Sequence, residues 1–106
     1  MNIVIVGVGK LGKILTKHLL DEKHDITIID KNASRIEEMV NELDVVGYCG
    51  NGASYQTQLN AYVNKSDILI ATTPSDELNI LCCLVAKKLG AKQTITRVRK
   101  NFWIIC

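Results

Sequence analysis

Short apolar runs alternate with amphipathic segments along this chain of 106 residues. The apolar runs have the length of strands and are rich in Val and Ile, which is typical of strands that a parallel sheet buries on both faces. They predict strands at residues 3–6, 25–30, 45–49, 67–72 and 93–98.

The segments between these strands carry apolar residues at helical spacing. The first predicted helix covers 10–20, and its apolar face comprises Leu11, Ile14, Leu15, His18 and Leu19. The second follows Asn32, a suitable N-cap, and its apolar face comprises Ile36, Met39, Val40 and Leu43. A short helix is expected near 55–62. The longest helix begins at Ser75, and Gly90 ends it as a C-cap.

This alternation predicts an α/β fold, a Rossmann-like doubly wound parallel sheet with helices on both faces. Right-handed crossovers with a switch after the third strand give five strands in the order 3-2-1-4-5. No repeat, linker or low-complexity stretch divides the chain, so we expect one domain over residues 1–99. The apolar residues 100–106 are interpreted as a tail without a companion strand, which invites association with another molecule.

Composition narrows the classes of function. Hydrophobic residues make up 47% of the chain and aromatic residues only 5%, so the core must rest on aliphatic side chains. The net charge is +2, and no basic stripe interleaved with aromatic residues supports nucleic-acid binding. The longest uncharged stretch, 45–64, is too polar to span a bilayer, and we expect no direct membrane insertion.

The sulfur and imidazole groups give little support for a metal or redox site. The cysteines form no CxxC pair, and buried free thiols are the favoured interpretation of Cys49, Cys82, Cys83 and Cys106. His18 and His24 lie on or just after the first predicted helix, away from the carboxyl ends of the strands. We interpret both histidines as surface or packing residues.

A glycine-rich loop joins the first predicted strand to the first predicted helix. It has the GxGxxG pattern, Gly7-Val8-Gly9-Lys10-Leu11-Gly12. Gly7 permits the tight turn, Gly9 lets the backbone approach a pyrophosphate, and Gly12 lets the helix pack closely on the strand. The helix would then direct free N–H groups and the positive end of its dipole towards phosphates. The loop is therefore a candidate dinucleotide-binding site.

An acidic residue stands where such a site needs one. Asp30 ends the second strand, at roughly the 20-residue spacing from the loop that dinucleotide-binding domains use. A carboxylate there accepts hydrogen bonds from the adenosine ribose and repels a 2′-phosphate, which favours NAD or NADH over NADP. Lys31 weakens this preference, because an amine at that position can pair with a phosphate.

Residues after the other strands should line the same crevice, because ligands bind outside the carboxyl ends of parallel strands. After the third strand, either a contact with adenosine or a simple turn explains Asn51, Gly52 and Ala53. After the fourth strand, the hydroxyl groups of Thr72 and Thr73 face the crevice before a capped helix. Arg97 ends the fifth strand, where it would pair with a phosphate, pair with a partner's acid, or lie in solvent.

Together these segments resemble a known family. The resemblance is carried by MNIVIVGVGKLGKILTKHLLDEKHDITIIDKNASRIEEM, GNGAS, SDILIATTPSDELNILCCLVAKKLGA and TITRVR. They are similar to the N-terminal nucleotide-binding domains, called RCK or TrkA-N domains, of Trk-type potassium-uptake regulatory proteins. The family usually has Gly-Asp-Ala-Thr where this chain has Gly50-Asn51-Gly52-Ala53-Ser54. It also continues into another helix and strand after the fifth strand, so the resemblance implies truncation before them.

The resemblance implies a regulatory subunit in the cytoplasm, held at the inner face of the membrane by a potassium transporter or channel. Family members bind NAD, NADH, ATP or ADP, and ligand exchange changes the geometry of a homo-oligomer, either a dimer or a ring of dimers. By position, the glycine loop would cradle the phosphates and Asp30 would hold the ribose. Residues 51–53 would lie near the adenosine, Thr72 and Thr73 would line the crevice, and Arg97 would reach the phosphates.

Two further interpretations remain open at this point. We expect a regulatory module rather than an enzyme, because no His-Asp, Cys-His or Tyr-Lys arrangement is placed to move a proton or a hydride. The alternative is the cofactor-binding half of an NAD-dependent oxidoreductase, since a fold does not fix a function. A third interpretation is a module that senses ATP against ADP.

Overall fold

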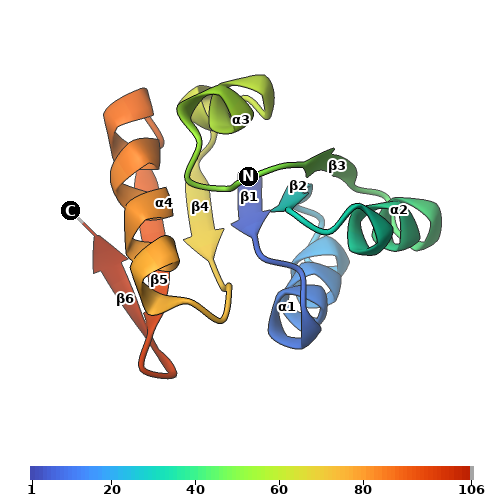
Figure 1. The fold of residues 1–106 in the computed structure, drawn as a ribbon. Coiled ribbons are helices and arrows are strands. Elements are labelled where there is room, and N and C mark those ends of the chain that lie inside the picture. Colours follow the sequence, from blue (N-terminus) through green and yellow to red (C-terminus); the bar gives the residue numbers. More distant parts are fainter. Residues whose placement is uncertain (106) are drawn as a thin grey trace.

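A computed structural model describes residues 1–105, in which the strands form one sheet in the order β3-β2-β1-β4-β5-β6 (Figure 1). The parallel strands β1 to β5 cover Asn2–Val6, Asp25–Asp30, Val46–Cys49, Ile68–Ala71 and Gln93–Val98. Chain order reverses at β1, because β2 and β4 flank it on opposite sides. The predicted α/β class and the order 3-2-1-4-5 are therefore confirmed.

The sheet also contains a strand that the apolar pattern does not predict. Residues Asn101–Ile105 form β6, which pairs antiparallel with β5 and sets Thr96 opposite Trp103 at the edge of the sheet (Figure 1). The two strands are joined by Arg99 and Lys100, whose φ angles of 52° and 67° lie in the left-handed region. Two such residues in succession are the geometry of a tight hairpin. The tail thus has a companion strand, and only Cys106 falls outside the described residues.

The four α-helices found among residues 1–105 cover the two faces of the sheet. They comprise α1 (Lys10–Asp21), α2 (Ala33–Glu42), α3 (Tyr55–Asn60) and α4 (Asp76–Leu89). Successive side chains of a strand point to opposite faces, so β1 contributes to two buried clusters. Ile3 and Ile5 pack with residues of α1 and α2, while Val4 and Val6 pack on the side of α4.

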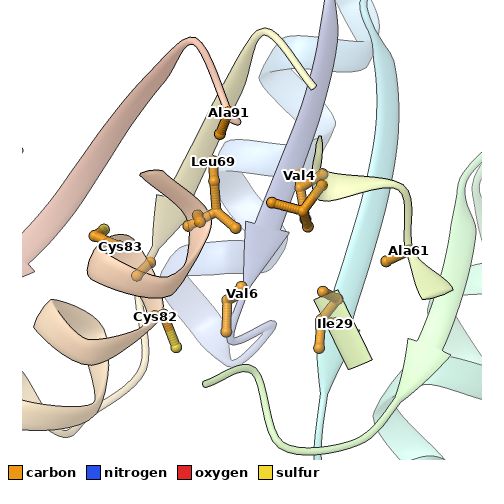
Figure 2. Packing of buried hydrophobic residues seen from close by; sticks show 11 residues of the cluster. Val4, Val6, Ile29, Ala61, Leu69, Cys82, Cys83 and Ala91 are labelled. Carbon is orange, nitrogen blue, oxygen red and sulfur yellow. The ribbon is translucent and has the colours of Figure 1, made fainter. Parts of the chain in front are cut away.

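Small side chains let α4 pack close to the sheet. Figure 2 shows Cys82 of α4 on the same side of the sheet as Val6 and Leu69. Cys82 and Cys83 are fully buried, and this burial raises the pKa of Cys82 to about 12 and the pKa of Cys83 to about 11. Both thiols are therefore neutral packing groups, as predicted, whereas Cys49 is exposed and the prediction of a buried thiol is wrong there.

Helix boundaries and apolar faces differ from the predictions at several positions, and His18 of α1 and Val40 of α2 are exposed although both were predicted on apolar faces. The short third helix ends at Asn60, and a 3-10 turn, η1, follows at Val63–Lys65. On α1, Ile14 is 47% exposed, while Thr16 is fully buried with its hydroxyl donating to the carbonyl of Gly12 at 2.7 Å. Close packing of the first turn brings Gly12 and Thr16 against the sheet, beside Leu15 and Leu19 of the predicted face. None of the described helices is long and apolar enough to cross a membrane.

Candidate functional site

A cavity of about 980 Å³ opens at the carboxyl ends of the parallel strands β1 to β5. It brings together most of the predicted site residues: Gly7, Gly9, Lys10, Leu11, Asp30, Lys31, Asn51, Gly52, Thr72, Thr73 and Arg97. Val8, Gly12 and Ala53 do not line it. A second hollow, of about 890 Å³, lies at the amino ends of the strands and is lined by none of the predicted site residues.

Packing within the protein requires two of the three loop glycines. Gly7 has a φ of 91°, and a Cβ there would lie 2.8 Å from the backbone nitrogen of Thr73. A Cβ on Gly12 would overlap the carbonyl oxygen of Gly7. The first glycine therefore permits the turn, and the last lets α1 begin directly against it.

The middle glycine is different, because nothing in the protein requires it. Gly9 has φ −70° and ψ −157°, an extended conformation open to any residue. The nearest atom to a Cβ built there is Nη1 of Arg35, at 3.8 Å, an ordinary contact distance. Gly9 lines the cavity, so the space that a side chain would fill is left open to a ligand.

Gly9 is also the N-cap of α1, and it provides no side-chain acceptor for the helix. The first N–H groups of an α-helix have no acceptor within the helix itself. By contrast, the N-termini of the other three described α-helices are capped by the side chains of Asn32, Ser54 and Ser75. The start of α1 is thus the N-terminus at which an anion can serve as the cap.

Asp30 has a structural role as well as the predicted binding role. It is 7% exposed, and its carboxylate accepts hydrogen bonds from the backbone N–H of Val8 and of Asn32, both at 2.8 Å. These bonds fasten the glycine loop to the end of β2. A carboxylate offers about four acceptor positions, so these two bonds leave two of them unused.

Arg35 is a cavity residue that the sequence reasoning missed. Its Nη1 lies 3.8 Å from Oδ2 of Asp30, and its side chain is 53% exposed. Together with Lys10, Lys31 and Arg97 it gives the lining four cationic side chains against the single carboxylate of Asp30. This excess of positive charge favours an anionic ligand. Arg35 could have been found from its place in the first turn after Asn32, because long side chains there point back towards the start of the helix.

The loop after β3 is held by its own hydrogen bonds. The Asn51 side chain accepts from the N–H of Ala53 at 2.9 Å, closing a turn, and the carbonyl of Gly52 accepts from Gln58 at 2.7 Å. A Cβ on Gly52 would overlap a methyl group of Val6. Packing and turn formation therefore explain much of this segment, while the backbone of residues 50–52 remains at the cavity.

The segment after β4 also has internal partners. Thr72 is buried, and its hydroxyl donates to the carbonyl of Gly7 at 2.7 Å, so it braces the glycine loop. The hydroxyl of Thr73 donates to Oδ1 of Asn79 at 2.6 Å. Asn79 also donates to the carbonyl of Arg97 at 2.8 Å. Asn79 and Gln58 are buried carboxamides behind the cavity that sequence reasoning missed, because nothing in their local sequence marks them.

Sequence comparison with known proteins identifies a family of domains to which nearly the whole chain is similar. The family model described as the TrkA-N domain matches residues 3–101. The chain is 46% identical over 104 residues to a "Trk system potassium uptake protein TrkA homolog" of Archaeoglobus fulgidus, covering 98% of this chain and 23% of that protein. It is 37% identical over 105 residues to the "Trk system potassium uptake protein TrkA" of Halomonas elongata, again covering 98% and 23%. The chain thus spans less than a quarter of these relatives.

Solved structures show the same fold. The TrkA-N domain of the inner membrane protein ybaL from Escherichia coli superposes with a TM-score of 0.84 at 24% identity, covering 91% of this chain and 71% of that one. A structure described as the GsuK channel bound to NAD gives 0.79 at 19% identity, covering 90% and 17%. An AMP-bound Kef C-terminal domain from Shewanella denitrificans gives 0.78 at 16% identity, covering 92% and 59%.

Proposed function

This chain belongs to the TrkA-N domain family, and from that membership we propose that it binds NAD(H), or alternatively ATP or ADP, to regulate a membrane potassium transporter or channel. The proposed site is the cavity at the carboxyl ends of the strands. The ligand would cross the glycine loop, with its phosphates at the start of α1 and its adenosine ribose at Asp30.

The single observation that carries this proposal is the open space at Gly9. Packing accounts for Gly7 and Gly12, but the protein leaves room for a side chain at Gly9. A phosphate held by the uncapped N–H groups of α1 would occupy that room, because the helix start attracts anions and offers hydrogen-bond donors. Phosphate binding would then explain why residue 9 is a glycine, which packing within the protein does not explain.

The charges around the cavity support the same ligand. Four cationic side chains and one carboxylate suit a molecule that presents phosphates to most of the site and hydroxyl groups to one point. Asp30 is that point, since its two free acceptor positions match the two hydroxyls of a ribose. One structural neighbour is described as bound to NAD and another as bound to AMP. These two ligands share an adenosine monophosphate unit.

The regulatory part of the proposal rests on the relatives, which are named as potassium-uptake proteins. A ligand that prefers one arrangement of assembled domains shifts the population towards that arrangement. We propose that copies of this domain assemble as a dimer or ring in the cytoplasm, on a membrane partner, and that the bound nucleotide selects among their arrangements.

Calorimetric titration of the purified chain with NADH, NAD, AMP, ADP and ATP tests the binding. We expect dissociation constants in the micromolar to millimolar range and no oxidation of NADH when carbonyl substrates are added. Gly9→Val should abolish binding, because the new side chain fills the space proposed for the phosphates, while circular dichroism shows an unchanged fold. Lys17→Ala, on the exposed face of α1, is the matched control and should bind normally. Retained affinity in Gly9→Val contradicts the proposed phosphate site.

A further inference from the structure

Asn79 uses its whole hydrogen-bonding capacity behind the cavity. The side chain is fully buried on α4. Its Oδ1 accepts from the backbone N–H of Thr73 at 2.8 Å and from the Thr73 hydroxyl at 2.6 Å. Its Nδ2 donates to the carbonyl of Thr73 at 3.0 Å and to the carbonyl of Arg97 at 2.8 Å. Two donors and two acceptor positions are all that a carboxamide has.

These four bonds join two parts of the cavity wall that the sheet itself does not hold together. The parallel ladder between β4 and β5 ends with Ala71 opposite Thr96. Thr73 and Arg97 lie beyond that last pair, and both line the cavity. Asn79 continues the connection from α4, so it fixes the separation of the two segments where strand pairing has stopped.

This wall lies on the side of the cavity away from Asp30. In a dinucleotide-binding sheet the acidic residue at the end of the second strand holds the adenosine ribose, and the pyrophosphate lies at the first helix. The second nucleoside must then extend over the ends of β4 and β5, where Thr73 and Arg97 lie. A mononucleotide such as AMP occupies only the half near Asp30.

We propose that Asn79 is a positioning residue for the second half of a dinucleotide, a role that rests on the nucleotide-binding function proposed above. By fixing Thr73 and Arg97 relative to α4, it keeps the wall beneath the second nucleoside in one arrangement. It contacts no ligand itself, because it is buried behind that wall. Its loss should therefore affect dinucleotides far more than mononucleotides.

The chain offers a matched control in a second buried carboxamide. Gln58 of α3 is fully buried, and its Nε2 donates to the carbonyl of Gly52 at 2.7 Å and to the carbonyl of Cys82 at 2.9 Å. It thus ties the loop after β3, which the proposal places near the adenosine, to α4. AMP and NADH share the adenosine, so a change at Gln58 should affect both ligands alike.

The test compares Asn79→Ser with Gln58→Met in the full chain, by calorimetric titration with AMP and with NADH. In Asn79→Ser we expect the dissociation constant for NADH to rise about tenfold and that for AMP to rise less than about threefold. In Gln58→Met the two constants should rise by the same factor. A purely structural role for Asn79 would weaken both ligands equally, and that outcome overturns the proposal.

A measurement on the unchanged protein covers the case in which Asn79→Ser does not fold. Hydrogen exchange of the Thr73 amide, which donates to Asn79, should slow about tenfold with saturating NADH and less than about twofold with saturating AMP. Equal slowing by the two ligands overturns the positioning role. If the chain binds AMP but not NADH, only the positioning role fails. If it binds no nucleotide, the proposed function fails and the positioning role fails with it.

Discussion

Helices α1 and α4 both begin at the cavity, yet their N-termini are built in opposite ways. The N-cap of α1 is Gly9, which has no side chain, and the first turn contains no acidic residue. The N-cap of α4 is Ser75, whose side chain accepts from the N–H of Leu78 at 3.1 Å. The first turn of α4 contains Asp76 and Glu77, whose negative charges complement the positive end of the helix dipole.

The difference separates a helix start that the protein caps itself from one that the proposed function assigns to a ligand. A side-chain cap typically stabilises a helix by about 1 kcal/mol, and α1 forgoes that stabilisation. At α4 the carboxylate of Asp76 also accepts from the N–H of Arg99 at 3.2 Å, which ties the helix start to the β5–β6 turn. The capped terminus therefore contributes to the fold, while the uncapped terminus is the one that the proposed function assigns to phosphates.

The largest effect is expected where α1 meets its own loop. Gly12→Val places a side chain against the carbonyl of Gly7, so α1 can no longer begin beside the turn. We expect a loss of about 3 kcal/mol or more in the free energy of unfolding, measured by denaturant titration. Gly9→Ala should change it by less than about 1 kcal/mol, because the Cβ has room. Similar losses for the two variants would contradict the distinction between the glycines.

The next effect concerns the carboxylate beside the uncapped terminus. Asp30→Ala should weaken NADH binding at least tenfold, about 1.4 kcal/mol, because it removes the ribose acceptor and the bond that holds Val8. To isolate the contribution of the ribose hydroxyls to binding, titration calorimetry can compare ATP with 2′,3′-dideoxy-ATP, which lacks them. The unchanged protein should prefer ATP, and the variant should not. A preference that survives in Asp30→Ala would refute the ribose assignment.

The smallest effect is expected at the capped terminus. Ser75→Ala removes the acceptor for the N–H of Leu78 and should cost about 1 kcal/mol of stability. For a domain of this size that loss lowers the melting temperature by roughly 4–8 °C. The dissociation constant for NADH should rise less than about threefold. If Ser75→Ala instead weakened binding as strongly as Asp30→Ala, the ligand would be using the start of α4 as well.

Local signals in the sequence were sufficient for the parallel sheet and for the glycine loop. Continuous apolar runs mark β1 and β4, and the conformational demands on Gly7 and Gly12 follow from the turn and the helix that flank them. β6 was missed because Arg99 and Lys100 form its turn without the Asn or Gly that usually marks a hairpin. Its pairing depends on the free edge of β5 rather than on its own pattern.

The parts of the candidate site that escaped prediction depend on contacts between distant segments. Asn79 and Gln58 look like ordinary helix residues in the sequence, and only the folded chain shows which carbonyl groups they meet. Thr72 was expected to face the crevice, but its hydroxyl bonds back to Gly7. The position of a residue directly after a strand predicts that it lies near the cavity, whereas packing decides the direction of its side chain.

The bond from Val8 to Asp30 has a consequence for how this domain would respond to a bound ligand. This bond fastens the glycine loop to the end of β2 from within the protein, so ligand binding at the loop should require little reordering of the chain. A preorganised pocket changes little on filling, and the occupied and empty domains should superpose closely. Under the regulatory function proposed above, the occupied and empty states would then differ in how whole domains are arranged rather than in the shape of one domain.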